Sequence, residues 1–240
     1  MTGGWKAKRF WTDVSIIETD GGFGVLLDTR RVQTPGKKPL IVPTESMAQA
    51  IAAEWAAQEG EIRPLTMPVT RAANSAIERV RPQKPEVAAM LAAYGETDLT
   101  CHRAASPAEL AARQAQGWDP VLAWAADTLG APLVPTAGVL PVPQPAASLD
   151  ALLAHVAAVD EFRLTALHDL VTLSGSILLG LAVAHRHLAP DTAWSLSRID
   201  EDWQIEQWGE DEEASEAAAF KRAQFLQADV FWSICEPPKA

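Results

Sequence analysis

The 240-residue sequence has only two cysteines, and they do not form a recognisable ligand set. Cys101 and Cys235 belong to no CxxC pair and have no histidine at a spacing typical of a metal site. Two thiols in a chain of this length do not make a disulfide framework, so the disulfide-rich secreted class is excluded. At 48% hydrophobic residues the chain can bury a core without cross-links, and we expect both thiols to be reduced and in or near that core.

Long apolar runs and targeting signals are also missing. The longest apolar stretch, residues 170–184, is interrupted by Thr172 and Ser174 and falls short of the ~20 residues that a membrane-spanning helix needs. The basic N-terminal residues are followed by Trp11-Thr12-Asp13 instead of an apolar segment and a cleavage site. The sequence therefore predicts neither secretion nor membrane insertion.

Positive charge is scarce. Lys and Arg number 20 against 31 Asp and Glu, which gives a net charge of −11. Because affinity for nucleic acid comes mainly from basic side chains that displace counterions, this balance argues against a nucleic-acid partner. It favours a partner surface that carries local positive charge.

Motifs for catalysis, cofactors and metals are missing as well. His185 and His187 are two residues apart, so on a helix they would point to opposite sides and could not share one ion. The glycines within residues 21–24 do not form a GxGxxG phosphate loop, and Ser174-Gly175-Ser176 is not a GxSxG nucleophile turn. We therefore predict no catalytic residue, no cofactor and no metal.

The N-terminal part has the alternating pattern of β-strands. Apolar runs at residues 14–17 and 23–27 flank Thr19-Asp20-Gly21-Gly22, which is a hairpin signal, and further turns predict an antiparallel meander that ends at residues 40–42. After Thr44 the period changes to about 3.6, which predicts a capped helix through Gln58. We expect residues 1–66 to form a β-rich N-terminal domain with one helix.

The remaining residues, 67–240, are predicted to form a larger helical domain. Gly130 is placed to end a helix in the left-handed conformation, and Ser148 and Asp211 are candidate N-caps. Five prolines in residues 131–145 predict an irregular connection, and residues 99–103 a short strand. The predicted helices cover residues 69–80, 86–94, 107–116, 118–129, 149–159, 162–171, 176–187, 191–208 and 212–232. The fold class is therefore α+β, with a small antiparallel β-containing N-terminal domain followed by a larger helical C-terminal domain.

Two tryptophans lie on predicted helices that are rich in alanine. Large aromatic side chains on such helices usually fill the core beside their small neighbours. We therefore assign Trp55 and Trp118 structural roles.

The densest group of ionisable side chains is at residues 200–213, where eight of fourteen residues are acidic. We treat residues 191–208 as one helix with 100° between successive residues. Five side chains then fall within about 80° of one another: Trp194, Arg198, Glu201, Ile205 and Trp208. Leu196, Ile199 and Trp203 fall on the opposite side. Because both sides are apolar, one can face the core and the other must meet a second element or a second protein.

Two interpretations of this helix remain open. Arg198 and Glu201 are three residues apart and can pair, either as a brace between helices or as part of a docking patch, since tryptophan and arginine dominate interface hot spots. An enzyme is the alternative: a carboxylate-dependent hydrolase that uses the acidic cluster at 200–213. That reading requires some of these acids to converge with a histidine in a concave pocket.

Several runs across nearly the whole chain resemble one known family. They include Lys8-Arg9-Phe10-Trp11, Leu27-Asp28-Thr29-Arg30, Ala53-Glu54-Trp55-Ala56-Ala57-Gln58, Thr97-Asp98-Leu99-Thr100-Cys101-His102-Arg103, Gln116-Gly117-Trp118-Asp119-Pro120, and residues 197–209. With these runs the chain resembles the ATP synthase F(1) complex assembly factor 2 family, the α-subunit assembly chaperone. His102 is a departure, because a tyrosine is expected there.

The resemblance implies a chaperone without catalysis or cofactor. It implies binding of the unassembled ATP synthase α subunit, which prevents aggregation of that subunit until a β subunit replaces the chaperone. The helical projection, and not the resemblance, assigns partner binding to Glu201, Arg198, Trp208, Ile205 and Trp194. The family-like sequence begins within ten residues of Met1, which predicts a bacterial, cytoplasmic member, and we expect a monomer. A third reading, a permanent structural subunit, predicts co-purification with the finished synthase.

Overall fold

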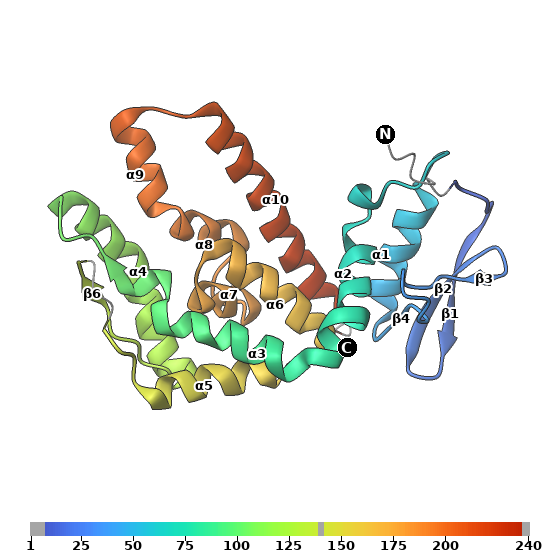
Figure 1. Cartoon of the computed structure of the whole chain (residues 1–240), viewed down its shortest axis with the longest axis horizontal. Helices are drawn as coiled ribbons and strands as arrows, with labels where there is room; N and C mark the ends of the chain where they lie inside the picture. Colours follow the sequence, from blue (N-terminus) through green and yellow to red (C-terminus); the bar gives the residue numbers. More distant parts are fainter. Residues whose placement is uncertain (1–7, 139–141, 237–240) are drawn as a thin grey trace. The chain divides into compact units, whose positions relative to one another are not determined.

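The computed structural model describes residues 8–138 and 142–236 (Figure 1). The chain divides into two compact units. The first contains Met1–Gln83, Glu161–Thr165 and Val230–Ala240, and the second contains Lys84–Asp160 and Ala166–Asp229. The predicted boundary after residue 66 lies earlier than the division after Gln83. No helix in the described part of the chain is long and apolar enough to cross a bilayer.

A four-stranded antiparallel sheet forms the start of the first unit. Strands β1 (Val14–Thr19) and β2 (Gly22–Leu27) make the predicted hairpin, with Thr19 opposite Gly22. The strands β3 (Arg30–Arg31) and β4 (Ile41–Val42) both pair with β2. The antiparallel bridge between Gln33 and Pro39 confirms the last turn of the predicted meander, but the final strand pairs with β2 and not with β3. Because β3 covers only Leu26 and Leu27, the other end of β2 stays free to pair with β4.

Helix α1 (Glu45–Ala56) packs against β1 and β2, and it confirms the predicted helix after Thr44. The Thr44 hydroxyl accepts a hydrogen bond from the Met47 amide at 3.2 Å, which caps the first turn. Four helical segments follow in the same unit: η1 (Pro64–Thr66), α2 (Pro68–Ser75), η2 (Ala76–Val80) and η3 (Arg81–Gln83). The Glu54 carboxylate of α1 accepts the amide hydrogens of Val69 and Thr70 and so fixes the start of α2.

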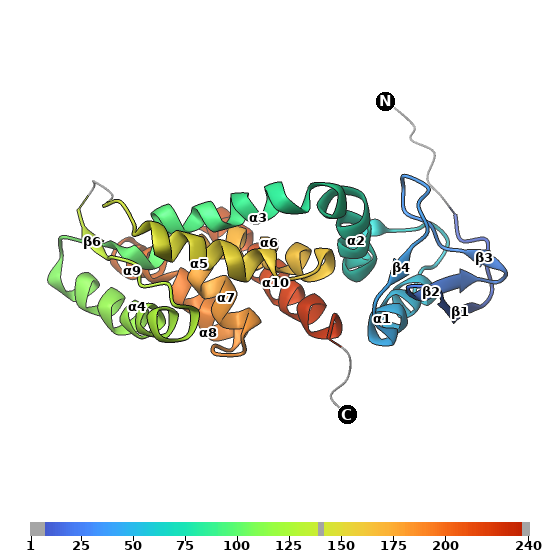
Figure 2. The ribbon, with the colours of Figure 1, turned by 90° about the horizontal axis from the view of Figure 1, so that it is seen from below.

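The second unit is helical, and with the first it confirms the predicted α+β class. Its elements before residue 160 are α3 (Lys84–Ala92), η4 (Ala93–Thr97), η5 (Leu99–Cys101), β5 (His102–Arg103), α4 (Ala108–Leu129), β6 (Thr136–Ala137) and α5 (Ala146–Ala157). The later ones are α6 (Glu161–Ser174), α7 (Ile177–Ala184), α8 (Pro190–Ser197), α9 (Ile199–Trp208) and α10 (Glu212–Ile234). The first turn of α6 and the end of α10 belong to the first unit. Figures 1 and 2 both show α3 running beside α5.

Three local predictions in this unit are wrong. The helices predicted over 107–116 and 118–129 are one helix, α4, with Gly117 inside it. Residues 99–101 form a helical turn, and only His102–Arg103 is a strand, paired with β6. Ser148 lies inside α5, where its hydroxyl donates to the Pro132 carbonyl at 2.7 Å. By contrast, Gly130 ends α4 at φ 64°, as predicted.

One hydrophobic core of the second unit joins four of its helices. Leu170 of α6, Val183 of α7, Trp194 of α8 and Phe225 of α10 pack together and are all buried. Gly180 allows α6 and α7 to approach closely, because a Cβ at that position would lie 2.7 Å from a methyl group of Val171. These contacts fix α8 and α10 beside each other. The two cysteines are free and buried, as predicted.

Candidate functional site

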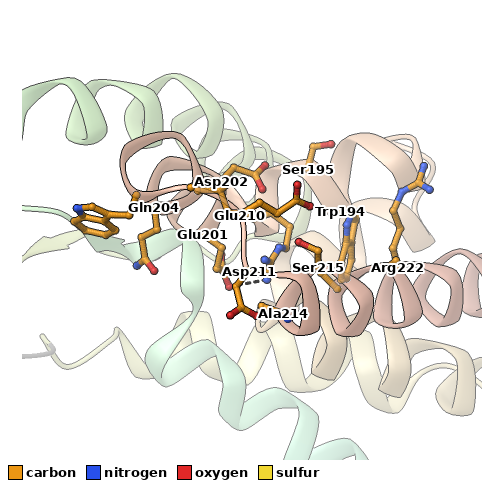
Figure 3. Close-up of a pocket in the computed structure, with 16 residues that line it drawn as sticks. Trp194, Ser195, Glu201, Asp202, Gln204, Glu210, Asp211, Ala214, Ser215 and Arg222 are labelled. Atoms are coloured by element: carbon orange, nitrogen blue, oxygen red, sulfur yellow. Dashed lines mark hydrogen bonds and ion pairs between the residues drawn. The ribbon is translucent and has the colours of Figure 1, made fainter.

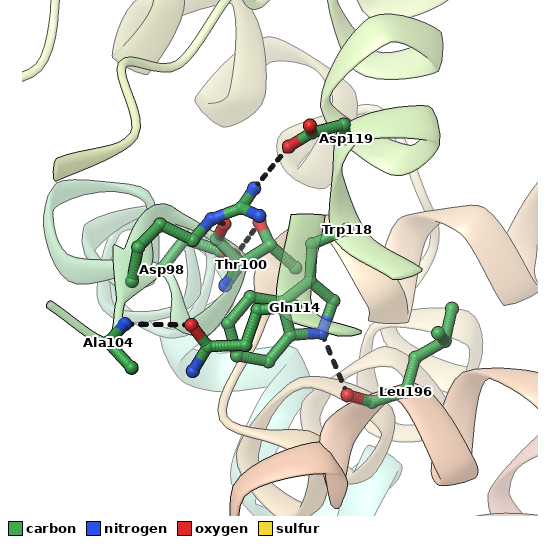
Figure 4. Close-up of polar contacts among 8 residues, drawn as sticks. Asp98, Thr100, Ala104, Gln114, Trp118, Asp119 and Leu196 are labelled. Atoms are coloured by element: carbon green, nitrogen blue, oxygen red, sulfur yellow. Dashed lines mark hydrogen bonds and ion pairs between the residues drawn. The ribbon is translucent and has the colours of Figure 1, made fainter. Parts of the chain in front are cut away.

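The chain bends between α8 and α9, where the sequence predicted one helix over 191–208. Arg198 leaves the helical conformation, with φ −110° and ψ 8°. In a continuous helix the Leu196 carbonyl would accept the amide hydrogen of residue 200. Here that carbonyl accepts a hydrogen bond from the Trp118 indole nitrogen, 78 residues earlier in the chain, at 2.8 Å (Figure 4). The prediction of a single helix was wrong because the helix is interrupted by a side chain that is distant in the sequence.

One side of α9 is attached to α4. The Gln114 amide nitrogen donates to the Asp200 carboxylate at 2.6 Å. The Arg113 guanidinium makes two 2.8 Å bonds to the Glu206 carboxylate, which lower the pKa of Glu206, and it also lies over the Trp203 ring. The side bearing Leu196, Ile199 and Trp203 is thus the one that faces the rest of the unit.

Gly117 explains how α4 comes so close at this point. A Cβ there would lie 2.8 Å from the end of Ile199 and 2.9 Å from the end of Leu196. Without that carbon, both apolar side chains pack directly on the α4 backbone. The glycine that looked like a helix break is therefore a packing site.

The other side of α9 lines an open groove that continues onto α10 (Figure 3). Its volume is about 550 Å³. The lining residues are Trp194, Ser195, Arg198, Glu201, Asp202, Gln204, Ile205, Trp208, Gly209, Glu210, Asp211, Ala214, Ser215, Ala218, Ala219 and Arg222. All five residues predicted to share one side are among them, even though the helix is not continuous.

The predicted side chains differ in how far they reach the solvent. Trp194 is 7% exposed and belongs to the core, so it offers the groove only an edge. Ile205 is 38% exposed and Trp208 is 79% exposed. An exposed tryptophan beside an exposed isoleucine is an apolar surface that a single folded chain does not need.

Arg198 and Glu201 form the pair that their spacing predicted. The guanidinium and carboxylate are 2.9 Å apart, with 21% and 47% of the two side chains exposed. Arg198 is the residue between α8 and α9, and Glu201 lies in the first turn of α9, so the pair lies at this junction and does not connect α9 to α4. The bonds from α4 to Asp200 and Glu206 do that instead, and Glu201 remains on the groove side.

The remaining charges of the groove are unevenly matched. Arg222 forms an ion pair with Asp191, and the Asp211 carboxylate accepts the Ala214 amide hydrogen at 2.8 Å, which caps α10 as predicted. For Asp202 and Glu210, in contrast, no hydrogen bond or ion pair is seen among the described residues. Both groove arginines are thus paired within the chain. Neither Asp202 nor Glu210 has an ion pair of its own, although Asp202 is also attracted by Arg113, which pairs with Glu206.

The convergence required by the hydrolase reading is not found in the described part of the chain. The groove lining includes no histidine. His185 and His187 instead contact Trp124, with ring centroids 5.8 and 4.8 Å away, so the expectation that they point apart was wrong. That expectation assumed a helix, whereas α7 ends at Ala184. No group of three metal-binding side chains is found among the residues that the structure describes.

The two structural tryptophans differ in their surroundings. Trp118 is fully buried, and the Arg103 guanidinium lies 5.3 Å from its ring centroid. Trp55 is half-buried and packs edge-on against Trp11 at 5.2 Å. Trp118 therefore has a second role beyond filling space, because its indole positions the end of α8.

Sequence reasoning missed the α10 wall of the groove. That wall consists of small side chains on one side of the helix: Ala214, Ser215, Ala218 and Ala219. Two adjacent pairs of small residues four positions apart were a readable signal, but small residues in this arrangement are found on many helices. Which side of α10 faced α9 could not be seen without the structure.

Comparison with known proteins gives a consistent result. The family profile described as ATP12 chaperone protein matches residues 8–126. The curated "Protein atp12, mitochondrial" of Schizosaccharomyces pombe is 23% identical over 221 residues, covering 87% of this chain and 76% of that protein.

Two solved structures have higher sequence identity to this chain. Atp12 from Paracoccus denitrificans is 54% identical, with a TM-score of 0.95, covering 97% of this chain and 100% of that one. A protein from Agrobacterium tumefaciens is 38% identical, with a TM-score of 0.91, covering 95% and 86%. The chain belongs to the ATP12 family of ATP synthase assembly chaperones.

Proposed function

We propose that this protein binds the unassembled α subunit of the ATP synthase F(1) sector and prevents its aggregation until a β subunit takes its place. Membership of the ATP12 family supports a role in synthase assembly. The observation that carries the proposal is the open apolar groove between α9 and α10, with Trp208 79% exposed at its edge. The proposed activity is binding, without a chemical step.

The physical logic of such a chaperone is simple. A subunit that awaits its partner exposes an apolar interface, and large exposed apolar patches tend to self-associate. A protein that covers the interface lowers the concentration of the exposed form by mass action. Release then requires only that the β subunit binds more tightly.

The composition of the groove fits a protein partner. Tryptophan and arginine are enriched in interface hot spots, and an apolar centre with charged edges is typical of specific interfaces. Trp208, Ile205, Arg198 and Glu201 meet on one surface here. We propose that these four residues, with the edge of Trp194, contact the α subunit, and that the protein acts as a monomer in the bacterial cytoplasm.

A charge reversal tests the proposal. Glu201→Lys should reduce capture of a co-expressed ATP synthase α subunit at least tenfold, about 1.4 kcal/mol, because it reverses a groove charge and places a lysine beside Arg198. Its folding should change little, since exposed ion pairs contribute only about 0–1 kcal/mol. Capture is measured by pull-down and folding by circular dichroism.

Glu216→Lys is the matched control. Glu216 is exposed on α10 and is not among the groove residues, so the same charge change should leave capture intact. Normal capture by a folded Glu201→Lys protein would contradict the assigned surface. Parallel co-expression with the β subunit alone should give no complex on size exclusion, and finding the chaperone in the finished synthase would favour a permanent subunit instead.

A further inference from the structure

The walls of the groove restrict what can occupy it. Both α9 and α10 are helices, and most of their backbone donors and acceptors are satisfied within the helix. An extended strand could therefore not gain the row of main-chain bonds that a sheet edge would offer. A helix satisfies its own backbone, so it is the form that can lie here without leaving polar groups unpaired.

The α10 wall is shaped for a close approach. Its groove-facing residues run from Ala214 to Arg222, and the first four are alanine or serine. Eight residues of rise correspond to about 12 Å, or roughly two helical turns. Small side chains over two turns let the axis of a second helix come near, while Ile205 and Trp208 on the opposite wall offer apolar contact.

The charge of the groove favours a positively charged occupant. Arg198 and Arg222 are already paired within the chain, whereas Asp202 and Glu210 form no ion pair or hydrogen bond among the described residues. The nearby Arg113 attracts Asp202 but is itself paired with Glu206. The second unit as a whole is also negatively charged, because it has 7 Lys and Arg against 20 Asp and Glu. The first unit has 13 against 11. The negative charge of the protein is thus concentrated in the unit that forms the groove.

We infer that the groove binds a cationic amphipathic helix of the captured subunit. About two turns of that helix would lie along α10, with an apolar side chain against Ile205 and Trp208 and a lysine or arginine beside Asp202 and Glu210. This inference rests on the proposed function and names the chemical character of the segment that is recognised. An acidic helix or a purely apolar helix would fit the shape of the groove but could not pair with its carboxylates.

Photo-crosslinking tests the nature of the segment. Benzoylphenylalanine placed at Gln204, which is exposed on the α9 wall of the groove, should crosslink to the ATP synthase α subunit in the purified complex. Mass spectrometry should locate the crosslink in a helical segment with more Lys and Arg than Asp and Glu. The same probe at Glu216, outside the groove, should not label that segment. A crosslink from residue 204 to an acidic or non-helical segment would overturn the inference.

Removal of charge tests the electrostatic part. Asp202→Asn combined with Glu210→Gln keeps the shape of both side chains, so capture should fall at least tenfold at low salt and differ much less from the unaltered protein at high salt. Equal capture at low salt would overturn the inference while leaving α-subunit binding in place. Failure of the unaltered chain to capture the α subunit at all would refute the proposed function and this inference together.

Discussion

Replacement of Trp118 by phenylalanine tests how the groove is positioned. The indole is fully buried and donates to the Leu196 carbonyl, and the Arg103 guanidinium lies over its ring. Phenylalanine fills most of the same space but has no donor. We expect the loss of the hydrogen bond to the half-buried Leu196 carbonyl to lower the free energy of unfolding by about 1–2 kcal/mol. The smaller ring should lower it by about 1 kcal/mol, and the weaker contact with Arg103 by several tenths of a kcal/mol more.

These losses add to about 3 kcal/mol, which for a chain of this size corresponds to a melting temperature lower by about 6–12 °C. Thermal unfolding followed by circular dichroism measures this drop. Trp208→Phe is the control, because the same exchange at a side chain 79% exposed should change stability by less than about 0.5 kcal/mol. If the two variants melt within a degree or two of each other, the assigned role of the indole bond is wrong.

Three further predictions concern other parts of the chain. Both cysteines should resist a thiol reagent at mildly alkaline pH until the protein is denatured, because they are buried and burial raises the pKa of Cys101 to about 12. Asp28→Asn should lower the melting temperature at neutral pH but not at acid pH. The amides of Asp13 and Thr12 lower the pKa of Asp28 below 3.8, so its stabilisation is present above that value and disappears as the pH falls through the lowered pKa. An equal difference at both pH values would contradict this cause. Glu54→Gln should lower the free energy of unfolding by about 1 kcal/mol, because its carboxylate caps α2, and urea unfolding should show this as a lower midpoint.

Local patterns in the sequence were sufficient for much of the fold. The glycine turn at Gly21 and Gly22 predicted the β1–β2 hairpin because a positive φ is needed there, and both residues adopt one. Thr44 predicted the start of α1 because its hydroxyl can cap the free amides of a first turn. Such signals involve neighbours in the chain, and therefore they can be read without the structure.

The candidate site was only partly visible in the sequence. Periodicity separated the α9 side chains that face α4 from those that line the groove, because the angle between successive residues is fixed within a helix. It gave no information about α10, whose small residues complete the groove. It also left the role of Glu201 open between a brace and a docking contact.

The sequence by itself determined the α+β class, most helices, the apolar sides of α9 and the pairing of Arg198 with Glu201, all of which depend on residues a few positions apart. Tertiary structure alone decided three further features: that α4 runs unbroken through Gly117, that the Trp118 indole ends α8, and that α9 and α10 enclose a groove. Each of these depends on side chains that are distant in sequence and meet only when the core packs. A repeating pattern specifies which side of a helix is buried, but not which helix will cover it.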